Sequence, residues 1–176
     1  LDDFEYASAI AFMLTGAAPD KELMNSALTG DINDPAILAA HIDRLIDSDL
    51  GQEQVARFAG LWFRTDGVVN VNRFGNDQFT QTVKNSMAQE IRETYKHAFY
   101  DESVPYKALF DAEFTFVDKT LSDFYGIPGS STDEFVKVST AGTPRGGLIA
   151  SGAFMTLYAH DNRTSPIKRS VHVRQD

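Results

Sequence analysis

The chain has 176 residues, 43% hydrophobic and 23% charged, so it can form one domain, or two small packed subdomains, around a real core. Its formal net charge of −9 argues against general nucleic-acid binding, because the phosphates would repel the protein. The lack of cysteine excludes disulfides, thiolate metal sites and a Cys-x-x-Cys-His haem-attachment site from this segment.

The first 64 residues carry runs of apolar residues at helical spacing. Asp34-Pro35 is the clearest start signal, since aspartate caps a helix and proline suits its first position. Trp62 lies on the apolar face of the last run, so we expect it to be buried. The pattern predicts an N-terminal helical subdomain over residues 1–64. Its helices are expected over residues 3–15, 20–28 and 35–47, and from Gly51 onward to Trp62.

The remaining chain is predicted to begin with a loop over residues 65–76. Apolar residues then recur every four positions, which predicts a long helix over about 76–100. Asp118 is expected to cap a short helix that ends at Gly126. The other expected elements are short strands near 113–117 and 135–138, and a helix over 148–158.

Residues 76–176 are expected to pack as one domain with the first subdomain. The predicted fold class is therefore mainly α: a multi-helix, bundle-like domain with at most a short two-stranded element. No signal peptide opens the sequence, and no apolar run approaches membrane-spanning length. The first residue enters a predicted helix directly, and the last lies in a charged segment. Both ends suggest a piece of a longer protein.

Glu90, Glu93 and His97 share one face of the predicted long helix, at spacings of three and four. Such a face can ligate iron or manganese when other helices supply partners. The characteristic di-iron spacing is Glu-x-x-His, whereas Glu93 and His97 lie four apart, and no second motif exists. A solvated face with a Glu–His pair is the favoured interpretation, and no metal site is predicted.

His160 is the most interesting histidine, because Asp161 follows it in a predicted loop. A nucleophilic triad would need a nearby serine and a carboxylate behind the imidazole. No Gly-x-Ser-x-Gly elbow exists, since Ser151 has isoleucine and alanine before it, so no hydrolase triad is predicted. Of the others, we expect His41 to be a packed or half-exposed core histidine, and His172 to lie in an extended tail and face solvent.

The charge is unevenly distributed along the chain. Residues 1–144 hold 11 basic and 23 acidic residues, whereas residues 145–176 hold five basic and two acidic ones. This asymmetry suggests that the C-terminal part meets something anionic, or an acidic face of its own domain. Arg145, in Thr143-Pro-Arg-Gly-Gly147, can belong to an anion nest. The favoured alternative is that the glycines permit close chain approach and Arg145 bridges to an internal acid.

The segment from Arg163 to Arg169 has a clear local interpretation. Thr164 or Ser165 can cap a helix that Pro166 opens, which leaves Lys168 and Arg169 on its first turn. Guanidinium groups there can hold a buried carboxylate or clamp the propionates of a bound cofactor. For any single arginine, structural anchoring is the favoured role.

Six segments then occur in order: residues 5–28, Phe58-Ala-Gly-Leu-Trp62, Glu93-Thr94, Phe114 to Gly126, Arg145-Gly-Gly-Leu148 and Arg163-Thr-Ser-Pro-Ile-Lys-Arg169. Together they resemble planctomycete-type c-type cytochrome proteins, which are large multidomain bacterial proteins whose modules are mostly of unknown function. The resemblance covers nearly the whole chain. It departs from the family pattern at Ser170, where a glycine is usual.

The resemblance also implies which segment would follow this one in the full-length protein. Family members continue into a proline-rich stretch and a Cys-x-x-Cys-His site, whereas this chain ends at Asp176. We therefore expect a helical module that precedes a haem c segment, with haem c in the parent protein. The same resemblance implies export to the periplasm or the cell surface.

The leading hypothesis is a helical module of an exported multidomain c-type cytochrome, involved in electron transfer. Its basic cluster would dock against the missing C-terminal haem segment or its propionates. One alternative is a haem-dependent peroxidase or oxidase module, with His160 or Tyr158 near the haem. Another is a non-catalytic scaffold or interaction module of a polysaccharide-degrading system. The candidate cofactor-binding residues are Arg145, His160, Arg163, Lys168 and Arg169.

Overall fold

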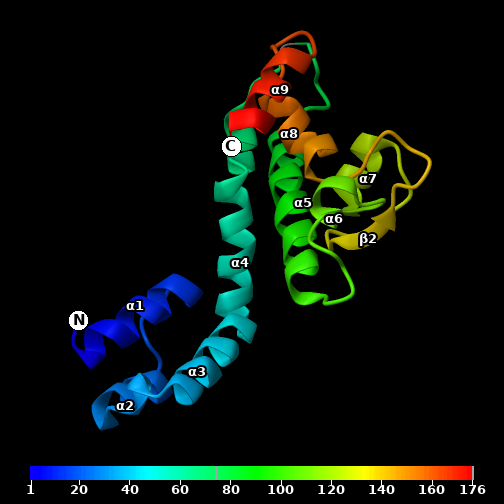
Figure 1. Cartoon of the computed structure of the whole chain (residues 1–176). Helices are drawn as coiled ribbons and strands as arrows, with labels where there is room; N and C mark the ends of the chain where they lie inside the picture. The colour runs from blue at the N-terminus through cyan, green and yellow to red at the C-terminus, as the bar shows by residue number, and fades with distance from the viewer. Residues whose placement is uncertain (74, 176) are drawn as a thin grey trace. The chain divides into compact units, whose positions relative to one another are not determined.

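A computed structural model of the chain describes residues 1–73 and 75–175. In this part helices predominate, and the strands form one two-stranded antiparallel sheet, so the predicted mainly α fold class is confirmed (Figure 1). The chain divides into two compact units, Leu1–Arg57 and Phe58–Asp176. The expected subdomains over 1–64 and 76–176, packed as one domain, stay a prediction. No helix in the described residues combines the length and apolar character needed to cross a bilayer.

The first unit is a cluster of helices, and aspartate side chains cap the N-termini of α1, α2 and α3. α1 begins with a capping box: Glu5 N–H donates to Asp2 Oδ1, and Asp2 N–H donates to Glu5 Oε2. Asp34 caps α3 ahead of Pro35, as the sequence predicts. The elements are α1 (Asp3–Thr15), α2 (Lys21–Thr29), the 3-10 turn η1 (Asp31–Asn33), α3 (Pro35–Asp47) and the start of α4 (Asp49–Trp62).

The core of this unit is small and is built largely from alanine and aliphatic side chains. Small residues on α1 and α2 let the helices approach closely, and full burial of each leucine or isoleucine contributes about 1.5–3 kcal/mol. The buried residues are Ala7, Ile10, Ala11, Leu23, Ala27, Ile32 and Leu45.

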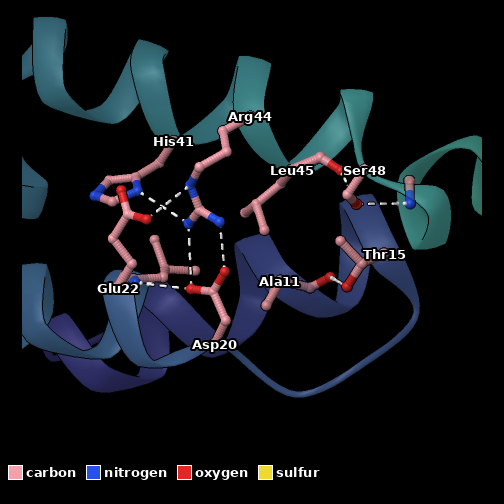
Figure 2. Close-up of polar contacts among 10 residues, drawn as sticks. Ala11, Thr15, Asp20, Glu22, His41, Arg44, Leu45 and Ser48 are labelled. Carbon is pink, nitrogen blue, oxygen red and sulfur yellow. Dashed lines mark hydrogen bonds and ion pairs between the residues drawn. The ribbon is translucent and has the colours of Figure 1, made fainter.

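A polar contact joins α2 to α3 beside this core (Figure 2). Asp20 caps α2 by accepting from Leu23 N–H at 2.9 Å, and its carboxylate also accepts from both terminal nitrogens of Arg44. The hydrogen bonds from Arg44 lower the pKa of Asp20. His41 Nδ1 lies 3.4 Å from Arg44 Nη2, and His41 is buried as predicted.

The second unit is organised around α5, which contacts η2, β1, α7 and α8. β1 pairs with β2 so that Phe114 faces Ser139 and Val117 faces Val136. Asp118 caps α7, and Gly126 ends it in the left-handed conformation, as expected. The elements are η2 (Thr65–Asn70), α5 (Gln81–Tyr100), α6 (Ala108–Asp111), β1 (Phe114–Val117), α7 (Lys119–Tyr125), β2 (Val136–Ser139), η3 (Leu148–Ala150), α8 (Gly152–Leu157) and α9 (Pro166–Gln175).

Several element predictions need correction. The loop over 65–76 contains the 3-10 turn η2, and α5 begins later than expected, because Thr80 caps it by accepting from Val83 N–H. The helix expected over 148–158 is split, since Ser151 ends η3 and caps α8. The extended tail predicted around His172 is wrong, because His172 lies in α9. Its ring centroid is 3.9 Å from that of Tyr158.

The prediction that Trp62 is buried is wrong, because 41% of its surface is exposed. Its ring stacks on Phe63 at 4.7 Å between centroids and meets Tyr95 edge-on at 6.3 Å. These neighbours cover only part of the indole. Phe58, one turn earlier, is 51% exposed, so helical spacing alone overstated burial at this end of α4.

Candidate functional site

The loop between α8 and α9 folds as a short hairpin that holds two of the candidate residues. His160 N–H donates to the Arg163 carbonyl at 2.9 Å, which leaves Asp161 and Asn162 at the turn. Ser165 then caps α9 by accepting from Lys168 N–H at 3.4 Å. The predicted start of this helix at Pro166 is thus confirmed.

Arg73, which sequence reasoning missed, joins this hairpin from a distant part of the chain. Its side chain is 14% exposed, and Nη2 donates to the Thr156 carbonyl at the end of α8. Its Nη1 lies 3.4 Å from Asp161 Oδ1. Arg73 therefore anchors the hairpin and offsets the charge of its single carboxylate. The sequence offered no signal beyond the presence of an arginine in an asparagine-rich loop.

A pocket of about 440 Å³ opens at this hairpin. We call it the basic pocket, because Arg73, Arg163, Arg169 and His160 line it together with one carboxylate, Asp161. Guanidinium groups bind carboxylates and phosphates through paired N–H donors, so the arrangement suits an anionic group. The apolar part of the lining consists of Phe79, Met87, Phe124, Met155 and Ala159.

The three cationic candidates near the C-terminus differ in their surroundings. Arg169 lines the basic pocket and its Nη1 lies 3.3 Å from Met155 Sδ, a weak acceptor. Arg163 lines the same pocket and is exposed. Lys168 is exposed on α9 and is not among the described residues that line the pocket. The structure thus brings together His160, Arg163 and Arg169.

Arg145 belongs to a different cluster, around the buried carboxyl of Glu90. Its guanidinium carbon lies 3.7 Å from the centroid of the Tyr125 ring, a cation–π contact. Tyr125 OH donates to Glu90 Oε2 at 2.7 Å, and Thr115 Oγ1 donates to Oε1 at 2.6 Å. Burial raises the pKa of Glu90, while Arg145 acts in the opposite direction. Arg145 therefore faces an internal acid.

Glycines before η3 and at the start of α8 allow this cluster to close. A Cβ at Gly147 would lie 2.3 Å from the Phe110 carbonyl oxygen, and one at Gly152 would lie 2.1 Å from the Tyr125 hydroxyl. The close-approach interpretation of Gly146-Gly147 is confirmed, since a Cβ at Gly146 would also meet the Ala112 carbonyl oxygen at 2.6 Å.

The face of α5 that the sequence marked as a possible metal site is not a solvated Glu–His pair. Glu90 is buried, whereas Glu93 accepts from Gln89 and lies 2.9 Å from Lys96 Nζ. His97 instead contacts Lys137 at 2.8 Å, and burial lowers its pKa. Within the described residues, no three His, Asp or Glu side chains converge as metal ligands do. Side chains from β1, α7 and β2 determine these partners.

Comparison with known families assigns most of the chain to one protein family. A family model described as "Protein of unknown function (DUF1592)" matches residues 1–127. The chain belongs to the DUF1592 family. The DUF1592 match includes the whole first unit and, in the second, runs through α7, so it covers Glu90 and Tyr125. It also covers Arg73, on the wall of the basic pocket, but ends before Arg145 and before the hairpin residues His160 and Arg163. No curated protein and no solved structure matched the chain.

Proposed function

We propose that this chain is a helical module of an exported multidomain c-type cytochrome and takes part in electron transfer. In this proposal the basic pocket binds carboxylates of a haem-bearing segment of the same protein, as haem propionates would present them. The observation that carries the proposal is the grouping of Arg73, Arg163 and Arg169 around one pocket that has a single carboxylate, Asp161. The positive balance of residues 145–176 in an acidic chain supports it.

The residues of the basic pocket fit such a group chemically. A haem has two carboxylates at the edge of an apolar ring system, and this lining offers both guanidinium donors and apolar surface from Phe79, Phe124 and Met155. Arg163 and Arg169 would bind and orient the carboxylates, while Arg73 holds Asp161 and so keeps the hairpin in place. When bound, the haem would supply a one-electron redox centre.

Export to the periplasm or the cell surface is part of the same proposal, because covalent haem attachment takes place there. The family resemblance supports this location, together with the order of the matching segments along the chain. A non-catalytic interaction module is a second candidate. Exposed aromatic side chains at Phe58, Trp62 and Phe110, each more than 40% exposed, favour it, since such rings bind partners or sugars.

The first experiment is a visible absorption spectrum with an intact mass, on the longest natural form of the protein. A Soret band and a mass above that of the polypeptide by whole haem groups would support the cytochrome proposal. A colourless protein at the polypeptide mass would refute it and favour the interaction module.

The role of the basic pocket is then tested in the haem-containing protein with a matched pair of substitutions. Arg163→Ala removes a cation that lines the pocket, whereas Lys168→Ala removes one on α9 outside the described lining. We expect the first to change the reduction potential and lower the thermal stability, and the second to change neither. Unchanged potential and stability in Arg163→Ala would count against the binding of propionates here.

A further inference from the structure

A second cavity, of about 270 Å³, lies within the second unit and has a different chemical character. Its floor is formed by Phe154 and Tyr158, which are each 9% exposed. Trp62, Phe110 and Val173 line it as well and are 41–53% exposed, so they form its rim. The remaining lining residues are Phe63, Ile149 and His172. We call this space the aromatic cavity.

The aromatic cavity is large enough to hold a small molecule. Protein interiors are close-packed, with few voids larger than a water molecule, whose share of liquid volume is about 30 Å³. An apolar void of about 150 Å³ already accommodates one benzene ring. The observed volume therefore suits one ring with a short substituent, or two fused rings.

The lining determines the class of occupant. Asp, Glu, Lys and Arg are absent from the described residues around the cavity, so a charged ligand would lose its hydration without gaining an ion pair. Aromatic rings in the floor, wall and rim favour a planar partner, through offset or edge-to-face contacts. Because Phe154 and Tyr158 are buried, an occupant must enter the cavity in order to contact them.

We propose that the aromatic cavity is a binding site for a small, neutral aromatic molecule of one or two rings. The inference does not depend on the cytochrome proposal, since the cavity shares no lining residue with the basic pocket among those described. Its segments come from the end of α4, α6, η3, α8 and α9, so all lie in one compact unit. Pockets of this kind, mostly apolar with few polar groups, are typical ligand sites.

The fluorescence of Trp62 can report on binding in the aromatic cavity, because Trp62 is the single tryptophan of the chain and lies at the rim. The probes are 4-bromophenol, which is neutral at pH 7, and 4-bromobenzoate, an anion of similar size. Bromine quenches indole fluorescence on contact. We expect saturable quenching of Trp62 by the phenol, at least about tenfold weaker binding of the benzoate, and a linear response to free bromide.

Two substitutions fill the aromatic cavity, and one matched control leaves it open. Val173→Phe and Ile149→Phe each add a ring at a lining position, whereas Val171→Phe adds the same ring to α9 outside the described lining. Circular dichroism establishes which variants fold. We expect the filled variants to weaken 4-bromophenol binding at least about tenfold and Val171→Phe to stay within about twofold of the wild type.

Two results would overturn the proposal. The first is quenching that rises linearly with 4-bromophenol and is equal in all folded variants, since this indicates collisions at an exposed ring. The second is a wild-type protein that elutes as a dimer and becomes monomeric in Val173→Phe, because a side chain of a second copy would then occupy the cavity.

Discussion

The hydroxyl of Tyr125 donates a hydrogen bond of 2.7 Å to Glu90 Oε2, across 35 positions of sequence. The contact fastens α7 to the middle of α5, and Thr115 fastens β1 to the other oxygen of the same carboxyl. Glu90 is 3% exposed, so its charged form has lost nearly all hydration. We therefore expect the stability of the second unit to depend on whether Glu90 is protonated.

Stability should change with pH through Glu90. Burial raises its pKa in the folded chain, so the folded state holds the proton more tightly than the unfolded state. The stabilisation is fully present below the unfolded pKa of about 4.3 and is lost as the pH rises through the folded value. We expect the unfolding free energy of the wild type, relative to Glu90→Gln, to increase between neutral pH and about pH 4.

Urea unfolding followed by circular dichroism at several pH values measures this difference. Glu134→Gln is the control, since it removes an exposed carboxyl in the same unit. A constant difference between wild type and Glu90→Gln over the whole range would show that Glu90 does not titrate differently on folding.

Removing the tyrosine hydroxyl should destabilise the chain. Tyr125→Phe leaves Glu90 Oε2 without that donor in a buried site, which costs about 1–3 kcal/mol at neutral pH. The double variant with Glu90→Gln completes a thermodynamic cycle. We expect a coupling energy of at least about 0.5 kcal/mol between the two positions. Simple additivity would mean that the hydroxyl acts independently of the carboxyl.

Two glycines with positive φ differ in what an added Cβ would meet. Gly142 and Gly147 both have positive φ, 77° and 62°, but a Cβ at Gly142 meets nothing within 4 Å. Gly142→Ala should cost only about 1–2 kcal/mol for the left-handed conformation. Gly147→Ala should cost about 1–3 kcal/mol more, because its Cβ would lie 2.3 Å from the Phe110 carbonyl oxygen and because its φ of 62° and ψ of 176° lie in a region that is essentially restricted to glycine. Equal midpoints of thermal unfolding would contradict the close approach.

In the first unit, Asp20 should contribute more to the free energy of unfolding than an ordinary helix cap does. Asp20→Ala and Asp34→Ala each remove a helix cap worth about 1 kcal/mol, but only Asp20 also accepts from Arg44 (Figure 2). The lowered pKa of Asp20 means that its contribution is present above the unfolded pKa and is lost as the pH falls. We expect Asp20→Ala to be the more destabilising variant at pH 7, and the excess to shrink in acid, as measured by urea unfolding.

Within the basic pocket, the residues that could be predicted from the sequence are those that lie close together along the chain. His160 and Arg163 are joined by a bridge within four residues, and Arg169 follows on the helix that Ser165 and Pro166 begin. Arg73 could not be found in this way, because its contact with the Thr156 carbonyl spans 83 positions.

The sequence by itself determined the mainly α class, most of the helices and several of their caps. Asp34-Pro35, Asp118 and Gly126 act within one helical turn, so neighbouring residues suffice to define where these helices begin and end. Tertiary structure alone decided burial, as with the buried Glu90 and the half-exposed Trp62. Helical periodicity identifies a face, but which partner covers that face depends on segments far away in the chain, and only packing brings them together.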